Sequence, residues 1–389
     1  MKKALWTLPA LGLIAGSAYA QSSVTLYGIV DEGVMINTNA KNTVNGHNVG
    51  GRQFSIDSNA GTQGSRWGIK GDEDLGGGLS TIFRLESGFN VSTGQFGQGG
   101  TAFGRQAYVG LASRQFGTVT LGRQYDSIND YVGLYGFAAA YGGSTTEHPG
   151  DLDNVNHTYR TNSTIKYASV NLSGLTFGGT VTLGGVPGQI SQSSGYSLGA
   201  NYARGPLGVG AAYEFFKNPA ATGAILNSNA SAATFGSLNS GYLGTDPANS
   251  LQIFTVGGNY KIGAAVLGAV YSNTRYQNIG AFDGATAVFN SYEVNALYQF
   301  TTALSAGIEY NYTKGNAVRG ELGDQRYNQV SMLFDYALSK RTDVYLLGTV
   351  QSASGTSSTG AQAVADIGGI GDSSNNHQAV VRIAIHHKF

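Results

Sequence analysis

"GYSLGANYARGPLGVGAAYEFFK", residues 195–217, contains two alternating segments separated by the tripeptide Arg-Gly-Pro. In the second segment one parity holds Gly208, Gly210, Ala212, Glu214 and Phe216, and the other parity is apolar: Leu207, Val209, Ala211, Tyr213 and Phe215. Alternation with a period of two is typical of a β-strand with one apolar and one polar face. A connection this short joins neighbouring antiparallel strands. The stretch therefore predicts a β-hairpin whose apolar face ends in aromatic residues.

The same periodicity recurs in sixteen segments, of which the first is 23–37 and the last is 377–389. Links after odd-numbered segments are generally long and polar, such as 38–64, whereas links after even-numbered segments are short, such as "NLSG" at 171–174. Outer-membrane barrels combine short periplasmic turns, long outer loops and an even number of strands. A soluble β-sandwich also alternates, but nothing in that fold makes every second connection short. We therefore predict an all-β fold, a 16-stranded antiparallel transmembrane β-barrel.

The polar parity of these segments predicts what the barrel contains. It carries carboxylates and amides on several strands: Asn201, Glu214, Glu293, Asn295, Gln299, Glu309, Asn311 and Asp335. A barrel with this many strands is too wide for side chains to fill its interior. The interior is therefore expected to contain water.

The composition excludes several classes of protein. The chain has 59 Gly, 6 Pro, 23 Tyr, 17 Phe and no Cys, with 23 basic and 23 acidic residues. No basic excess points to nucleic acid, and stability cannot come from disulfides. No apolar stretch after residue 20 is long enough for a transmembrane helix, so membrane insertion requires a closed barrel.

The N-terminus has the pattern of a secretory signal. Lys2 and Lys3 precede a short apolar run that ends in the small residues of "SAYA" at 17–20. A basic start, a short apolar centre and small residues at the cleavage site are typical of a signal peptide. We therefore divide the chain into a signal peptide at 1–20 and a single transmembrane β-barrel at 21–389.

Several motifs carry a resemblance to a known family. The C-terminal "VVRIAIHHKF" ends on Phe389 and resembles the last strand of outer-membrane proteins, whose final phenylalanine helps the barrel-assembly machinery to recognise them. In chain order, "SSVTLYGIVDEGV", "SRWGIKGDEDLGGGL", "RQAYVGL" and "FGTVTLGRQYD" together resemble the general diffusion porins of β-proteobacteria.

This resemblance implies a cellular location, an oligomeric state and a set of partners. It implies a homotrimer in the cell outer membrane, in contact with outer-membrane lipid and lipopolysaccharide. Each barrel would be a passive pore for ions and small hydrophilic solutes. The third outer loop would fold inward and narrow that pore.

The third loop falls at about 125–159, after a strand that ends near Gln124. It contains the apolar residues Tyr131, Val132, Leu134, Tyr135 and Phe137, which are expected to pack against the inner wall. Its acidic residues are then expected to face the lumen: Asp126, Asp130, Glu147, Asp151 and Asp153. The alternative, a mobile surface loop, stays open from the sequence.

Basic residues are expected opposite this loop. Strand parity turns a set of charged residues inward: Arg66, Lys70, Arg84, Glu86, Arg160 and Lys166. The resemblance implies an arginine cluster of Arg66, Arg105 and Arg160 with a constriction glutamate at Glu86. Parity points Arg105 and Arg123 outward, so each needs a bulge or bend to face the lumen. Placement at the rim, or pairing with lipopolysaccharide phosphates, is the alternative for all of these arginines.

Arginines facing carboxylates would select solutes by the sign of their charge. We expect a water-filled channel for passive diffusion with a mild preference for anions. A substrate-specific channel and a non-conducting surface adhesin are the alternatives. The six histidines lack neighbouring nucleophile motifs, and no P-loop or H-E-x-x-H motif occurs. We therefore predict no catalytic residues, no metal and no cofactor.

Overall fold

A computed structural model describes residues 23–45, 47–220 and 236–389. Sixteen strands form a closed antiparallel ring, as predicted, and one further strand, β2, brings the sheet to seventeen strands. The predicted signal peptide at 1–20 lies outside the described residues. No helix in the described ranges has the length and hydrophobicity needed to cross a membrane.

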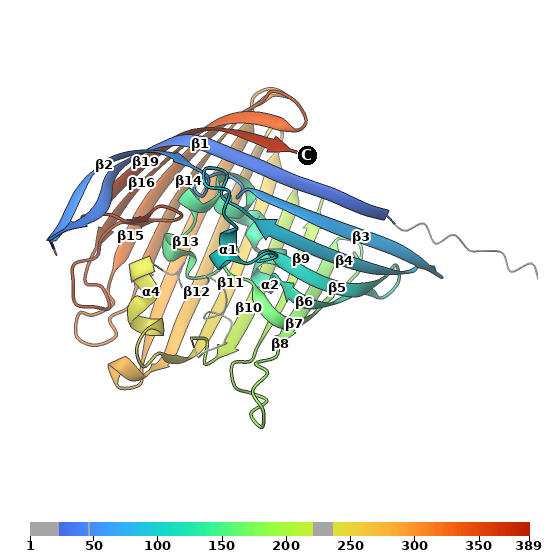
Figure 1. Ribbon diagram of the computed structural model, residues 1–389, viewed down its shortest axis with the longest axis horizontal. Helices are drawn as coiled ribbons and strands as arrows, with labels where there is room; N and C mark the ends of the chain where they lie inside the picture. Colours follow the sequence, from blue (N-terminus) through green and yellow to red (C-terminus); the bar gives the residue numbers. More distant parts are fainter. Residues whose placement is uncertain (1–22, 46, 221–235) are drawn as a thin grey trace, which may run out of the picture.

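The ring follows the chain order. Its strands are β1 (Ser23–Val44), β3 (Arg66–Gly76), β4 (Leu79–Gly88), β5 (Gln106–Ser113), β6 (Gly117–Gln124), β7 (Thr161–Ala168), β8 (Leu175–Thr182), β9 (Gly195–Arg204), β10 (Leu207–Lys217), β11 (Ala248–Ile262), β12 (Ala265–Ile279), β13 (Ala285–Gln299), β14 (Leu304–Gly315), β15 (Arg326–Ala337), β16 (Thr342–Ser354) and β19 (His377–Lys388). Each strand pairs with its neighbours in the chain, and β1 pairs with both β3 and β19, which closes the barrel (Figure 1).

The first long connection differs from the expectation. Residues 38–64 are not a loop throughout, because β1 continues to Val44 and β2 (His47–Asp57) returns beside it. β1 therefore pairs with β2 in its later part and with β3 in its earlier part. Between β2 and β3, residues 58–65 leave the ladder. Residues 38–45 and 49–53 of this hairpin lack an apolar alternation, and both faces of this part are largely exposed to solvent.

The two faces of the wall agree with the predicted parity. Outward-pointing Leu198 and Val294 are well exposed, as lipid contact requires, whereas inward-pointing Glu214, Glu293 and Glu309 are buried. A carboxylate on the lipid side near the bilayer centre would cost several kcal/mol, so the inward position is favoured. At the C-terminus, Phe389 exchanges backbone hydrogen bonds with Gly28 of β1.

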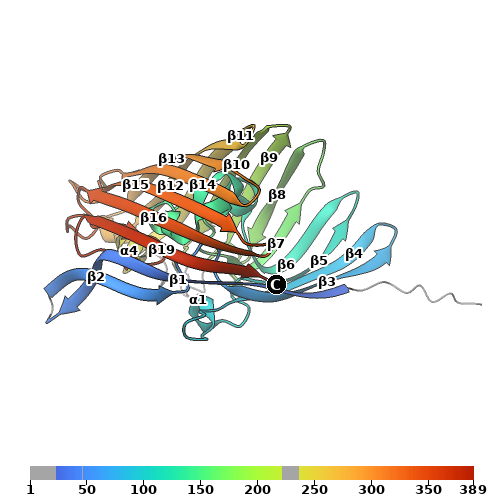
Figure 2. The same ribbon diagram turned by 90° about the horizontal axis from the view of Figure 1, so that it is seen from above.

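The interior is occupied by the connection between β6 and β7, residues 125–160, which we call loop three. Its short helices are α2 (Ser127–Tyr131), η1 (Gly133–Tyr135), η2 (Ala138–Gly142), η3 (Ser144–Thr146) and η4 (Pro149–Asp151). Figure 2 shows these helical turns inside the ring of strands. The remaining elements lie in other connections: α1 (Gly97–Gly100), α4 (Gly236–Leu243), η6 (Gly280–Phe282), β17 (Asp366–Ile367) and β18 (Gly371–Asp372).

The largest apolar core therefore lies within the barrel rather than between two sheets. Ile128 and Val132 of loop three pack with Tyr242 of α4 and with inward side chains such as Phe216 and Ile253. Loop three is thus attached to the wall by hydrophobic burial as well as by polar contacts.

Candidate functional site

Loop three lies against the inner wall because wall glycines leave room for it. A Cβ atom at Gly199 would lie 2.5 Å from the Tyr131 ring, and one at Gly307 would lie 2.7 Å from the Phe137 ring. Any larger residue at these positions would therefore push the aromatic side chains away from the wall. This close approach explains part of the high glycine content of the chain.

The apolar part of loop three was predicted largely correctly. Tyr131, Val132, Tyr135 and Phe137 are buried against the wall. Leu134 is an exception, because it is 45% exposed. The alternative of a mobile surface loop is wrong, since this segment packs inside the barrel on β9 and β10.

Three arginines line one cavity of about 460 Å³, which we call the arginine cavity. Arg66 begins β3, Arg105 immediately precedes β5, and Arg160 ends loop three. Loop three, residues 58–65 and the connection between β4 and β5 form the rest of the cavity wall. Side chains from three separate parts of the chain therefore bring positive charge to one space.

Hydrogen bonds fix two of these arginines through a shared tyrosine. The Nη2 atoms of Arg105 and Arg160 each donate to the Tyr125 hydroxyl at 2.9 Å, and the Arg160 guanidinium lies over the Tyr125 ring. Arg105 also donates from Nε to Glu86 at 2.8 Å, and Glu86 accepts a 2.8 Å bond from Tyr27. The arginines are thus held in one orientation rather than left to move in solvent.

The side chains of Tyr125 and His157 in loop three lie in a net positive electrostatic potential. Burial opposes ionisation of Tyr125, but Arg105, Arg160 and Arg66 outweigh burial and lower its pKa. Burial and the same three arginines lower the pKa of His157 well below its usual value. His157 therefore stays neutral at pH 7 and adds no cation of its own.

The two arginines with ambiguous parity do turn inward. Arg105 lies in a bend before β5, outside the regular alternation. Arg123 follows a register shift at Gly122, whose φ is 137°. A bulge of this kind rotates the next side chain to the other face. Arg123 then donates from Nε to the Gly104 carbonyl at 2.7 Å, so it braces the backbone behind the cavity.

The other predicted bases lie apart from the arginine cavity. Lys70 and Arg84 both lie over the Tyr27 ring, at 5.6 Å and 5.8 Å from its centroid. Lys166 forms an ion pair with Asp130 and donates to the Tyr125 carbonyl at 3.1 Å. These three bases are inward-facing, as parity predicted, but they do not line the cavity.

Three of the predicted loop acids need correction, because they are buried inside loop three and do not face open lumen. Asp126 caps the N-terminus of α2 and accepts a bond from Asn154. Asp151 accepts 2.9 Å bonds from the backbone N–H groups of Asn156 and Thr158. Burial raises the pKa of Asp126 to about 6.

Asp153, the third buried acid, takes part in a cluster that the sequence did not predict. Its Oδ2 lies 2.6 Å from His148 Nδ1, and His148 Nε2 lies 2.9 Å from Glu293 of β13. Glu293 also accepts the Phe137 backbone N–H at 2.8 Å. This cluster fixes loop three to β13 of the barrel wall. Sequence parity correctly placed Glu293 inside, but nothing local marks its partner.

Glu147 is the loop acid that lines the arginine cavity. Its carboxylate accepts bonds from Asn156 and Thr158. Burial first, and the nearby Asp151 second, raise the pKa of Glu147 well above its usual value. The ionised form is therefore disfavoured. The cavity is lined by three arginines and by Glu147, whose ionised form is disfavoured, while Glu86 lies beside it and is paired with Arg105.

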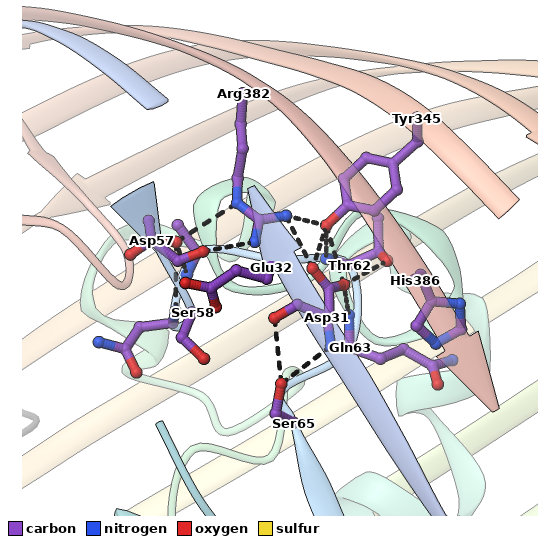
Figure 3. Close-up of polar contacts among 12 residues, drawn as sticks. Asp31, Glu32, Asp57, Ser58, Thr62, Gln63, Ser65, Tyr345, Arg382 and His386 are labelled. Atoms are coloured by element: carbon purple, nitrogen blue, oxygen red, sulfur yellow. Dashed lines mark hydrogen bonds and ion pairs between the residues drawn. The ribbon is translucent and has the colours of Figure 1, made fainter. Parts of the chain in front are cut away.

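A second cluster, drawn in Figure 3, was not predicted. Arg382 of β19 donates to Asp31 of β1 at 2.9 Å, and its Nε lies 3.3 Å from Asp57 of β2. Tyr345 donates to Asp31 at 2.7 Å and accepts the Thr62 backbone N–H at 3.1 Å. The cluster ties residues 58–65 to the barrel, so it supports one wall of the arginine cavity. The sequence did carry one signal for this cluster: Arg382 has the strand parity opposite to that of its apolar neighbours, which places its side chain on the inner face.

Both the sequence and the fold are similar to those of known proteins. A family model described as Gram-negative porin matches residues 7–356. An outer membrane porin protein of Bordetella pertussis is 30% identical over 385 residues, which is 90% of this chain and 94% of the relative. Outer membrane porin protein 32 of Delftia acidovorans is 28% identical over the full length of both chains. The solved structure of an anion-selective porin from Comamonas acidovorans has a TM-score of 0.73 at 22% identity, over 95% of this chain and 100% of that one.

Proposed function

We propose a function from the premise that this chain belongs to the Gram-negative porin family, whose members are channels rather than enzymes. The chain is an outer-membrane protein. We propose that its barrel is a water-filled pore for passive diffusion of ions and small hydrophilic solutes. Loop three and the arginine cavity form the narrow part of this pore and give it a mild preference for anions.

One observation carries the preference for anions: three arginines line the cavity, whereas its acid Glu147 has a raised pKa and the adjacent Glu86 is paired with Arg105. Fixed charge at a narrow point selects by sign without a binding step. Because Arg105 is paired with Glu86, we assign most of the selectivity to Arg66 and Arg160. In our proposal Glu147 weakens this selectivity without reversing it.

For biogenesis and assembly we propose what the sequence led us to expect. We propose that residues 1–20 are removed as a signal peptide and that the barrel-assembly machinery recognises Phe389. We propose that three copies form the working assembly. An outer membrane protein of Vibrio cholerae with the same fold is described in a trimer form, which supports this proposal.

The test is single-channel recording in a planar bilayer, with reversal potentials measured across a potassium chloride gradient. We expect stepwise openings with a reversal potential of the sign that chloride preference gives. Arg66→Gln and Arg160→Gln should each move it toward zero. Arg84→Gln is the matched control and should leave it almost unchanged, because Arg84 lies outside the cavity.

Each contrary outcome has a clear meaning. A wild-type preference for cations would contradict the role of the arginines. Absence of ion conductance would favour a non-conducting adhesin barrel. Saturation of the current by one solute class would favour a substrate-specific channel.

A further inference from the structure

The inner face of β10–β13 changes in character toward the long loops. Deeper inside the barrel, several of its inward positions are polar: Glu214, Thr255, Ser272, Ser291 and Glu293. Toward the loop ends of the same strands the inward side chains become large and apolar, and they are almost fully buried: Phe216, Leu251, Ile253, Tyr276 and Phe289. An inner wall in contact with water would carry polar side chains here. This part of the lumen is therefore filled rather than open.

The helix α4 packs on these apolar side chains. It belongs to the connection between β10 and β11 and lies at the end of the barrel that carries the long loops (Figure 1). Tyr242 of α4 is fully buried and stacks on Tyr276, with the ring centroids 5.4 Å apart. The Tyr242 ring also meets the Phe289 ring edge-on, at 5.7 Å. Aromatic packing thus holds α4 against the inner wall.

The same helix joins two other connections. Leu238 of α4 is buried and lies beside η4 of loop three, where a Cβ atom at Gly150 would be 3.2 Å from the Leu238 side chain. α4 also lies against β18, and Gly241 lies next to Ser358 of the connection between β16 and β19. η4 in turn contacts β17. These segments form one packed body, which we call the α4 assembly, between the β10–β11 wall and the connection that precedes β19.

The arginine cavity takes its lining from elsewhere. Within the described residues, its lining includes nothing from α4 or from β10–β16. The inward ionisable side chains of β10, β13 and β14 are all carboxylates: Glu214, Glu293 and Glu309. A water path along these strands would therefore avoid the arginines and pass carboxylates instead.

We propose that α4 seals the acidic side of the lumen, so that solutes must pass the arginine cavity. Leu238 and Tyr242 hold the seal in place. This inference rests on the proposed pore function and adds a second determinant of its anion preference. The arginines set the sign of the selectivity, and α4 closes the route that would avoid them. Fixed charge controls selectivity only where no parallel path carries the opposite charge.

The first test is single-channel recording of the full-length protein with Leu238→Asn combined with Tyr242→Asn. Both substitutions keep the net charge and place an amide in apolar surroundings, which disfavours docking of α4. We expect the conductance to rise and the reversal potential in a potassium chloride gradient to shift toward zero, because cations gain a path past the carboxylates. Ile190→Asn is the control and should change neither quantity, since Ile190 is 89% exposed in the connection between β8 and β9.

A second measurement does not depend on conduction. The chain has no cysteine, so a single introduced thiol can be followed with a charged, water-soluble maleimide. Ile253→Cys places the thiol at a fully buried position in the core that contains Tyr242. Adding Leu238→Asn and Tyr242→Asn should speed its labelling at least about tenfold, because labelling requires the open state and about 1.4 kcal/mol of lost docking free energy gives that factor. Asn59→Cys, at an exposed position that lines the arginine cavity, should react equally with and without these substitutions.

The outcomes separate this proposal from the pore proposal. Wild-type recordings alone test the pore, whereas the labelling rate tests the seal even in a barrel that does not conduct. An unchanged reversal potential in a variant whose Ile253→Cys thiol has become reactive would overturn the seal as a determinant of selectivity. Rapid labelling of that thiol with α4 unaltered would overturn it as well, because the acidic side would already be open.

The milder Leu238→Ala change covers the case in which the double variant does not fold. Folding of each variant is checked by its mobility on unheated gels. Leu238→Ala should shift the conductance, the reversal potential and the labelling rate in the same directions as the double variant, but by less. A loss of conductance in either variant would overturn the proposal in favour of α4 as a support for loop three.

Discussion

Replacing Arg382 with methionine should destabilise the barrel strongly. The Arg382 side chain is fully buried, and its guanidinium contacts the carboxylates of Asp31 and Asp57 and the Tyr345 hydroxyl (Figure 3). Methionine retains the length of the side chain and much of its volume but removes the charge. The two carboxylates would then remain buried without their cation.

The size of the effect follows from this burial. Removing one partner of a buried ion pair costs about 3–5 kcal/mol, because the remaining charge stays desolvated. Arg341→Met is the matched control, since Arg341 is exposed in a turn. A surface change of that kind costs less than about 0.5 kcal/mol.

The assay is equilibrium unfolding in urea, with the barrel in detergent micelles or lipid vesicles. Adding Asp31→Asn to Arg382→Met should recover part of the loss, because it removes one of the two unpaired carboxylates. A loss below about 1 kcal/mol in Arg382→Met would refute the reasoning. A double variant less stable than Arg382→Met would refute it as well.

Two further predictions concern loop three. Burial disfavours the charged form of His148, but Asp153 and Glu293 outweigh burial and raise its pKa well above the usual value. Protonated His148 therefore gives the folded loop its full stabilisation below about pH 6.5. This stabilisation is lost as the pH rises through the pKa that His148 has in the folded protein. Channel noise from a loosened loop three should therefore increase as the pH rises above neutral. The His148→Gln variant should be noisier than wild type at neutral pH and should lack this rise. Equal pH profiles for the two proteins would contradict the role of His148. Gly143→Ala should shift loop three and alter conductance, because Gly143 has a φ of 72° and a Cβ atom there would lie 1.9 Å from the Gly61 carbonyl oxygen. Gly94→Ala has a similar φ of 73° but open space around it, so it should leave conductance as in wild type.

The wall could be predicted from the sequence because one physical rule applies to every strand. Outward residues meet lipid and inward residues meet water or loop three, so parity alone placed Glu214, Glu293 and Glu309 inside. The same rule was insufficient for Arg105 and Arg123, because a bend and a bulge interrupt the alternation there. Their orientation depends on local backbone geometry that residue types specify only weakly.

The loop acids show a different limit. A carboxylate in an inward-folded loop can face water or satisfy the loop's own backbone, and residue type alone does not separate these roles. Asp126 did carry a signal, since an aspartate immediately before a short helix is a preferred N-cap. For Asp153 and Glu293 the decisive partner, His148, comes from packing across the barrel.

The cluster around Arg382 has a consequence for the order in which the pore is built. Asp31 and Arg382 are 351 positions apart in the chain, and their contact requires the first and last strands to lie together. The same contact network holds Thr62 and its neighbours, which form one side of the arginine cavity. A barrel in which the first and last strands have not yet met therefore lacks a finished arginine cavity as well as a closed wall. Closing the wall and completing the arginine cavity thus depend on the same contacts, so a half-assembled barrel has neither.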